Sequence, residues 1–247
     1  MRWRLVDFEY WTAAMNMGID EAVCEGVGKG TSPPTIRFYG WRPSAVSIGC
    51  FQSLAEEVDY HECLKLGIDV VRRRTGGGAV YHDEEGEITY SVIAPEKLMP
   101  RDIDAAYREV CGWIIKALDI LAVEARFSPV NDIMVGGKKI SGSAQTRRGG
   151  VFLQHGTLLL DLDAATMFKV LKVSKAKAGK EGVSPRTRVT SLREFGITYR
   201  EQILVPLRDS FTRDKDWEEG TWSDEELHRA SQLADKRYSS QEWTFSR

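Results

Sequence analysis

The residues best suited to chemistry form one short run: three arginines at 72–74, then Thr75, then three glycines at 76–78. Glycine has no Cβ, so a triple glycine between two strand-like runs gives an anionic ligand access to the backbone amides. The arginines add positive charge and forked hydrogen-bond donors. We therefore predict a loop that binds a carboxylate or a phosphate. The alternative is a tight turn with a solvated basic flank.

A second candidate is Lys139, in a segment that is typical of a β-hairpin. Ile133 and Val135 alternate with polar residues up to the glycines at 136–137, after which a return strand begins. A single lysine on a strand is commonly a solvated edge residue, but small neighbours leave a groove around this one. Alternation predicts two faces of the return strand, one with Ile140, Gly142 and Ala144 and the other with Lys139, Ser141, Ser143 and Gln145.

Four motifs, in the order in which a known family carries them, give the chain a specific resemblance to that family. They are RRRTGGGAVYHD at 72–83, NDIMVGGKKISGSAQ at 131–145, LQHGTLLL at 153–160 and KEGVSPRTRVT at 180–190. Together they resemble the lipoate-protein ligase A family, within the biotin/lipoate protein ligase superfamily, and the resemblance covers nearly the whole chain.

The resemblance implies a two-step acylation that uses ATP with Mg²⁺. Lipoate or octanoate would first form an acyl adenylate, and a lysine of a carrier domain would then displace AMP. The implied carriers are lipoyl domains of 2-oxoacid dehydrogenase acyltransferase subunits and the glycine-cleavage carrier protein. Both steps develop negative charge on oxygen, which fixed cations and amides stabilise in a dry site. Lys139 matches the catalytic lysine of the family.

The resemblance also assigns substrate or adenylate contacts. For some of the residues it assigns, a purely structural role stays open. His82 and His155 could be hydrogen-bonded structural histidines, and Asp132 could be a turn-supporting carboxylate. The basic 180–188 segment could be a solvated connector instead of a loop that closes over the adenylate. The assigned residues are Arg72, Arg73, Gly76, Gly77, Gly78, Ala79, Tyr81, His82, Asp132, Ser141, His155, Lys180 and Arg186.

The order of the expected elements indicates an α+β fold, with a mainly antiparallel or mixed sheet flanked by helices. Apolar periodicity predicts helices over 13–27 and 102–121, and strands that follow one another without regular helical crossovers argue against a doubly wound sheet. We expect one catalytic domain over 1–247 of the lipoate-ligase type. The chain ends where the accessory domain of longer family members would begin, so adenylation is expected to need a separate accessory subunit.

Composition excludes several classes of function. The net charge of −2 and a pI near 6.2 argue against a nucleic-acid partner. No stretch is apolar for long enough to be a membrane span or a signal core, so we expect a cytoplasmic protein without a membrane partner. The four cysteines and four histidines lack metal-ligand spacing, which predicts no structural metal.

Three alternatives stay open at this stage. An octanoyl or lipoyl transferase of the same fold would use a carrier thioester and a cysteine, which in such enzymes precedes the hairpin or follows the lysine strand; neither 124–127 nor 141–143 contains one. Biotin ligases share the scaffold but carry a different phosphate loop. The chain could also be a non-catalytic binder of lipoyl domains, although that would leave the combination of Lys139 and Arg73 unexplained.

Overall fold

A mixed eight-stranded sheet forms the centre of the protein in the computed structural model, which describes residues 1–172 and 188–247. The strand order is β11-β1-β2-β6-β10-β9-β8-β7. From β2 to β7 every neighbouring pair is antiparallel, whereas β1 runs parallel to both β2 and β11. The strands are β1 Trp3–Trp11, β2 Thr35–Trp41, β6 Glu87–Pro95, β7 Ala125–Ser128, β8 Asp132–Val135, β9 Lys138–Arg148, β10 Val151–Leu159 and β11 Trp217–Glu219.

A second, three-stranded sheet carries the glycine loop. Its order is β4-β3-β5, with β3 Ala45–Ile48 between β4 Asp69–Arg72 and β5 Val80–His82. The loop at 73–79 therefore joins the two outer strands across the end of the central one. The short helices α2 Leu54–Glu57, α3 Tyr60–Leu66 and α5 Ala164–Val170 supply residues to the apolar cluster beside this sheet.

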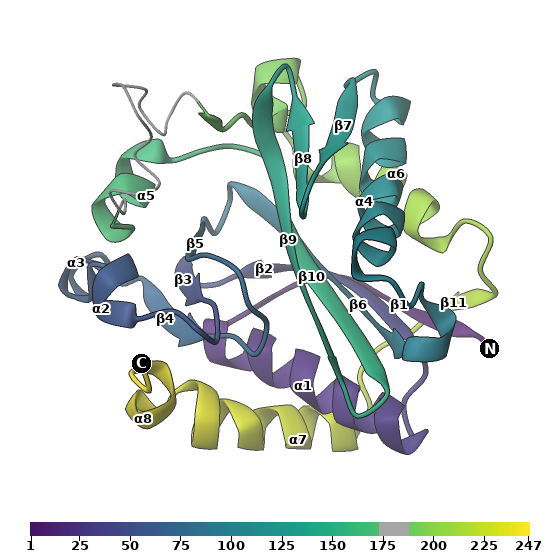
Figure 1. Ribbon diagram of the computed structural model, residues 1–247, viewed down its shortest axis with the longest axis horizontal. Coiled ribbons are helices and arrows are strands. Elements are labelled where there is room, and N and C mark those ends of the chain that lie inside the picture. The colour runs from purple at the N-terminus through teal and green to yellow at the C-terminus, as the bar shows by residue number, and fades with distance from the viewer. Residues whose placement is uncertain (173–187) are drawn as a thin grey trace.

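Helices cover both faces of the large sheet (Figure 1). On one face α1 Ala13–Lys29 and α7 Asp224–Leu233 lie side by side, and on the other α4 Ile103–Ile120 packs with α6 Arg200–Thr212. Each face has its own apolar core, because inward side chains alternate along the strands. The short elements that remain are η1 Glu96–Leu98, η3 Leu192–Phe195, η4 Ala234–Tyr238 and α8 Gln241–Thr244.

The helices begin and end at the residues their sequences favour. Thr12 caps α1 by accepting a hydrogen bond from Met15 N, and Gly30 ends the helix in the left-handed conformation with φ 75°. Asp102 caps α4 in the same way through Ala105 N. The α+β prediction is confirmed, as are the expected helices and the hairpin at 132–148. Strand β1, its parallel pairing and helix α6 were not predicted.

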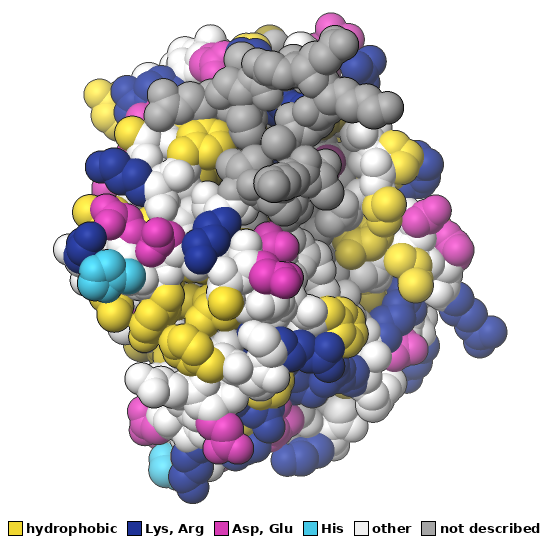
Figure 2. Space-filling view, turned by 60° about the vertical axis from the view of Figure 1, so that its left-hand side comes forward, with side chains coloured by type: hydrophobic (Ala, Val, Ile, Leu, Met, Phe, Trp, Pro, Cys, Tyr) yellow, Lys and Arg dark blue, Asp and Glu magenta, His cyan; other side chains and the backbone are white. Residues whose placement is uncertain are grey.

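The surface mixes charges of both signs. On the side drawn in Figure 2, acidic and basic side chains are interspersed with apolar ones instead of forming a single-signed area. Within residues 1–172 and 188–247, no helix combines the length and the apolar character that crossing a membrane would require.

Candidate active site

Arg73 organises the glycine loop from inside. Its buried guanidinium donates from Nε to Thr75 Oγ1 at 3.1 Å and from Nη1 to the carbonyl and hydroxyl of Ser47 at 3.1 and 3.2 Å. Nη2 donates to the carbonyls of Gly76 and Gly78 at 2.7 and 2.8 Å. An arginine has five N–H donors, and these five bonds use all of them. Arg73 therefore shapes the loop and supplies charge, but has no spare N–H for a ligand in this conformation.

The backbone amides of the loop are left available. No hydrogen bond joins the N–H of Gly77, Gly78 or Ala79 to another residue of the described ranges. Because a peptide is planar and trans, a carbonyl bound to Arg73 directs the N–H of the same peptide to the opposite side. Gly77 has φ 94°, a conformation that favours glycine. The loop is thus a set of fixed, unpaired donors beside a buried cation, which suits an anionic oxygen.

Lys139 lies on the strand opposite this loop. Its Nζ contacts Asp132 Oδ1 at 2.6 Å, so the two arms of the hairpin are joined by an ion pair that is about half-exposed. A Cβ at Gly142 would lie 2.6 Å from that Nζ, which means that the lysine side chain extends across the space above the glycine. Ala144 of the same strand approaches the glycine loop, with its Cβ 3.9 Å from where a Cβ of Gly77 would lie.

A β-bulge corrects the predicted faces of the lysine strand. The pairing shifts between Ile133 and Met134, so that Ser141 pairs with core residue Ile133 and Lys139 pairs with Met134. Directly paired residues share a face, so Ser141 does not share the face of Lys139. Simple alternation was therefore wrong for Ser141, whose hydroxyl is buried without a hydrogen-bond partner in the described chain.

The two site histidines are buried and each is held by a carboxylate. His82 Nδ1 lies 2.7 Å from Glu87 Oε1, and its ring stacks on Trp41 with centroids 4.0 Å apart. His155 Nδ1 lies 3.0 Å from Asp20 Oδ2. Burial lowers the pKa of His155, and the pull of Asp20 in the other direction does not compensate. These contacts fit a structural role for both histidines, and both rings also line a cavity.

One cavity of about 540 Å³ brings most of the predicted residues together. The predicted residues that line it are Arg73, Gly77, Gly78, Ala79, Tyr81, His82, Asp132, Lys139, Ser141 and His155. Gly76 does not line it, and Lys180 and Arg186 lie outside the described residues. Its other lining residues are mainly small or apolar, among them Trp41, Ile140, Gly156 and Leu159.

Arg72 is a correction to the predicted site. It does not line the cavity, and its guanidinium instead donates to backbone carbonyls of two segments, at Gly49 and Gln52 and at Trp243 and Thr244. The indole of Trp243 in turn donates to the carbonyl of Arg72 at 2.8 Å. Arg72 therefore ties the C-terminal residues to β4.

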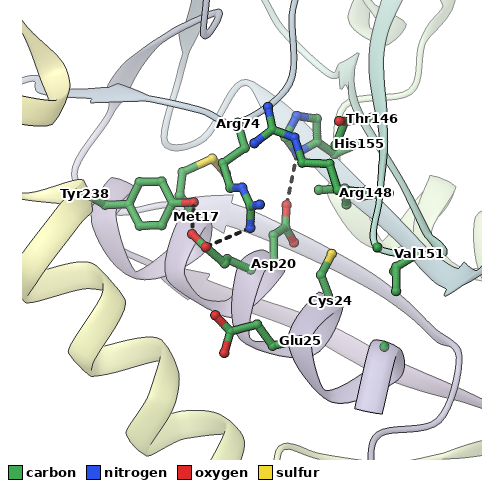
Figure 3. Close-up of a pocket in the computed structure, with 14 residues that line it drawn as sticks. Met17, Asp20, Cys24, Glu25, Arg74, Thr146, Arg148, Val151, His155 and Tyr238 are labelled. Carbon is green, nitrogen blue, oxygen red and sulfur yellow. Dashed lines mark hydrogen bonds and ion pairs between the residues drawn. The ribbon is translucent and has the colours of Figure 1, made fainter. Parts of the chain in front are cut away.

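A second cavity of about 350 Å³ adjoins the first and shares His155 and Met17 with it. It lies between α1 and the β9–β10 hairpin, where Figure 3 shows Asp20 and Cys24 rising from the helix toward His155 and Arg148. Leu153 and Val151 supply apolar wall, and Arg74 pairs with Glu21 at 2.7 Å along one side. An extended apolar group entering from the first cavity would pass His155.

Thiols and metal ligands are poorly placed for chemistry in the first cavity. All four cysteines are free, and none lines it. Burial raises the pKa of Cys111 to about 11, although its sulfur lies 3.8 Å from Ser143 Oγ on the lysine strand. Cys50 lies nearer the loop, with its N–H bonded to the carbonyl of Thr75 at 2.9 Å. Among the described residues, no group of three or more His, Cys, Asp or Glu side chains could hold a metal ion.

Four residues of the site were missed from the sequence: Asp20, Ser47, Thr75 and Glu87. A buried acid within an apolar helix or strand is a signal, because such a charge is rarely buried without a partner. Asp20 lies among apolar residues of α1, and Glu87 begins the apolar strand β6. Ser47 and Thr75 carry no comparable signal.

Comparison with known proteins agrees with this geometry. The family described as Lipoyl protein ligase A/B catalytic domain matches residues 12–204. The octanoyltransferase LipM of Anoxybacillus flavithermus is 34% identical over 276 residues, which cover 99% of this chain and 98% of that protein.

Solved structures of lipoate protein ligases are also similar to this chain. A bi-partite lipoate protein ligase from Thermoplasma acidophilum, studied with its E2 lipoyl domain, superposes with a TM-score of 0.87 at 33% identity and covers 99% of this chain and 96% of its own. A crystal structure of lipoate-protein ligase A bound with ATP gives 0.85 at 33% identity, with 99% of both chains covered. The chain therefore belongs to the lipoyl protein ligase A/B catalytic-domain family.

Proposed function

We propose that the protein is an ATP-dependent ligase that activates lipoate or octanoate as the acyl adenylate and transfers the acyl group to a lysine of lipoyl carrier domains. The observation that carries the proposal is the first cavity, where the ammonium of Lys139 and the free amides of the glycine loop meet without a cysteine in the lining. A cation and fixed amide donors suit an acyl phosphate anhydride, whereas thioester exchange needs a thiolate in place.

In the first step a carboxylate oxygen of the acid forms a bond to the α-phosphorus of ATP, and the bond to the β-phosphate oxygen breaks to release pyrophosphate. The amides of Gly77, Gly78 and Ala79 would hold the carboxylate, and the charge of Arg73 behind them favours the anion. Magnesium would arrive with the nucleotide, held mainly by its phosphates. Asp132 is the carboxylate among the described residues of the cavity lining that could contact it.

In the second step the amine of the carrier lysine attacks the acyl carbon, and the bond to the AMP oxygen breaks. Lys139 would stabilise charge on the acyl oxygen and on the departing phosphate as a compact cation. Asp132 holds that ammonium at 2.6 Å before substrate binds, and can then accept a hydrogen bond from the incoming amine. The roles of these residues are part of the proposal.

The second cavity is the proposed site for the acyl tail. It opens past His155 and Met17 and is walled by Leu153 and Val151. Each methylene buried against such a wall contributes about 0.8 kcal/mol. Octanoate and lipoate have the same eight-carbon chain and would share this path. They would differ at its far end, near Cys24 and Glu25, where lipoate carries a disulfide ring.

The second candidate function is octanoyl transfer from a carrier thioester. It is favoured by the 34% identity to an octanoyltransferase over almost the whole chain. Such a reaction needs an activated thiol. The candidate thiol is that of Cys50, which is partly exposed and whose N–H is bonded to Thr75 beside the glycine loop. Burial raises the pKa of Cys24, and it raises the pKa of Cys63 and of Cys111 to about 11.

One experiment separates these functions. An apo lipoyl domain is incubated with the protein and either lipoate, ATP and Mg²⁺ or an octanoylated acyl carrier protein, and its intact mass is measured. ATP-dependent gain supports the ligase, gain from the carrier supports the transferase, and no gain with either leaves a lipoyl-domain binder. A variant with all four cysteines replaced by alanine or serine should keep the ligase activity, whereas a thioester route through Cys50 would be lost.

We further propose that a separate accessory subunit assists the first step. The similar Thermoplasma enzyme is described as bi-partite, and its structure is covered to 96%. The purified chain should then transfer octanoate from preformed octanoyl-AMP but release pyrophosphate slowly from octanoate and ATP. Equal rates for the two reactions would contradict this part alone.

A further inference from the structure

Two chains of hydrogen bonds converge on Arg73. In the first, Arg73 Nη1 is bonded to Ser47 Oγ at 3.2 Å, Ser47 Oγ lies 2.8 Å from His82 Nε2, and His82 Nδ1 lies 2.7 Å from Glu87 Oε1. Thr89 also donates to that oxygen of Glu87 at 2.7 Å. All of these side chains are buried, with Glu87 only 1% exposed.

The second chain repeats the pattern from another part of the sequence. Arg73 Nε is bonded to Thr75 Oγ1 at 3.1 Å, Thr75 Oγ1 lies 2.7 Å from His155 Nε2, and His155 Nδ1 lies 3.0 Å from Asp20 Oδ2. Figure 3 shows the bond between His155 and Asp20 at the edge of the second cavity. The other oxygen of Asp20 is paired with buried Arg37 at 3.1 Å.

The number of donors indicates the direction of both chains. Each hydroxyl accepts an N–H of Arg73, so its own proton is free to be donated to the adjacent histidine Nε2. A histidine that accepts at Nε2 is neutral and carries its proton on Nδ1, from which it donates to the carboxylate. Both histidines are thus expected in the Nδ1–H form, with every donor of Arg73 directed at a specific acceptor.

We propose that Glu87 and Asp20 are positioning residues for the acyl-transfer site, each acting through a neutral histidine and a hydroxyl on the orientation of Arg73. This inference rests on the proposed function only where ligand binding is concerned. Arg73 holds the carbonyls of Gly76 and Gly78, so its orientation sets the direction of the amides in the same peptides. Glu87 therefore preorganises the anion site from outside both cavities, whereas Asp20 does so from the wall of the second cavity.

The first test needs no ligand. In ¹⁵N-labelled protein at neutral pH, long-range ¹H–¹⁵N spectra should show His82 and His155 as Nδ1–H tautomers, with the exposed His61 as the internal reference for a histidine that averages between tautomers. In Glu87→Leu no acceptor is left for Nδ1–H, so His82 should lose its preference for that tautomer. A wild-type protein with His82 or His155 protonated on Nε2 would overturn the proposal, whatever the protein catalyses.

The second test asks whether Glu87 acts through Arg73. Affinity for a non-hydrolysable octanoyl-sulfamoyl adenosine is measured calorimetrically for wild type, Glu87→Gln, Arg73→Lys and the double variant. Each single change should weaken binding about tenfold, the equivalent of one hydrogen bond to a charged group, and the double should be little weaker than Arg73→Lys. The same cycle with Asp20→Asn tests the second chain.

Glu226→Gln is the matched control. Glu226 is also a buried carboxylate, bonded to Arg4 at 2.7 Å, and it does not line the first cavity. It should lower the melting temperature but leave the affinity unchanged. If the two substitutions weaken binding independently, so that their fold-changes multiply in the double variant, the proposal is overturned. A wild-type chain that does not bind the adenylate analogue would instead contradict the proposed function, while the tautomer measurement would still decide the network.

Discussion

The two ends of the first cavity are built in opposite ways. At the glycine loop, Arg73 is buried, uses all five donors and is backed by two hydrogen-bonded chains. At the hairpin, the side chain of Lys139 is 42% exposed and its one ion pair in the described structure joins it to Asp132. Rigid amides can hold an anion whose position is fixed, whereas a reacting acyl group changes its charge and geometry. The difference fits the proposed function, in which preorganised donors hold an anion at one end and a partly exposed cation acts at the other.

The largest effect should come from removing the partly exposed cation, Lys139. Lys139→Ala should lower acyl transfer from preformed octanoyl-AMP by about 10³-fold, the size seen when one charge-stabilising group is lost. Its stability should change little, because the side chain is half-exposed. Lys138→Ala is the control, since this neighbour pairs with exposed Glu194 at 3.4 Å. Equal rates for the two variants in a single-turnover assay would remove Lys139 from the mechanism.

Displacing the lysine without removing it should have the next largest effect. A methyl group at Gly142 would meet Lys139 Nζ at 2.6 Å and Cε at 2.7 Å, both on a flexible side chain. Gly142→Ala should therefore fold normally but slow transfer by about 100-fold, as expected for a reacting group moved by roughly an ångström. In a Lys139→Ala background, Gly142→Ala should not slow transfer further. A further loss of rate there would show that Gly142 acts in another way.

The rigid end should respond in stability instead. A Cβ at Gly49 would lie 2.2 Å from the carbonyl oxygen of Gly77, which is backbone and cannot rotate away. Gly49→Ala should cost about 1–3 kcal/mol in the free energy of unfolding, measured by urea denaturation, because the loop must shift. Gly112→Ala provides the comparison, since nothing lies within 4 Å of its Cβ position and alanine favours the helix. A neutral Gly49→Ala would mean that the loop is not rigid.

A smaller effect is expected for the ion pair at the hairpin end of the cavity. Asp132→Asn keeps the shape of the side chain but removes its charge, and partly exposed pairs contribute about 0.2–1 kcal/mol. If Asp132 only orients the lysine, the rate of acyl transfer should fall by no more than about fivefold, which is the equivalent of about 1 kcal/mol. A much larger drop that depends on magnesium concentration would instead indicate that Asp132 contacts the nucleotide-bound metal.

The smallest effect is a pH dependence of stability at His155. Because burial lowers its folded pKa below the ordinary value of about 6.5, the unfolded chain takes up the proton first as pH falls. Stability from the neutral histidine is present above pH ~6.5 and is lost between that value and the folded pKa, with a slope of at most about 1.4 kcal/mol per pH unit. His155→Gln should remove this slope from thermal melts. A wild-type protein that becomes more stable in this window on acidification would contradict the direction of the shift.

Much of the site could be predicted because its signals are local. A triple glycine after arginines, and a lysine beyond a glycine turn, indicate a loop and a hairpin from neighbouring residues alone. The predicted face of Ser141 was wrong because a bulge places one extra residue in the strand, and alternation cannot foresee where pairing slips. Arg72 failed because its partners are backbone carbonyls from the opposite end of the chain.

The sequence by itself determined the α+β fold, the family and the two segments that meet in the first cavity, since periodicity, turn residues and motif order are properties of neighbours along the chain. Tertiary structure decided which of two adjacent arginines faces the cavity, and it placed Asp20 and Glu87 at the ends of the two hydrogen-bonded chains that reach Arg73. Such pairings depend on the register and packing of strands far apart in sequence, where a buried charge is tolerated only if a distant partner arrives to satisfy it.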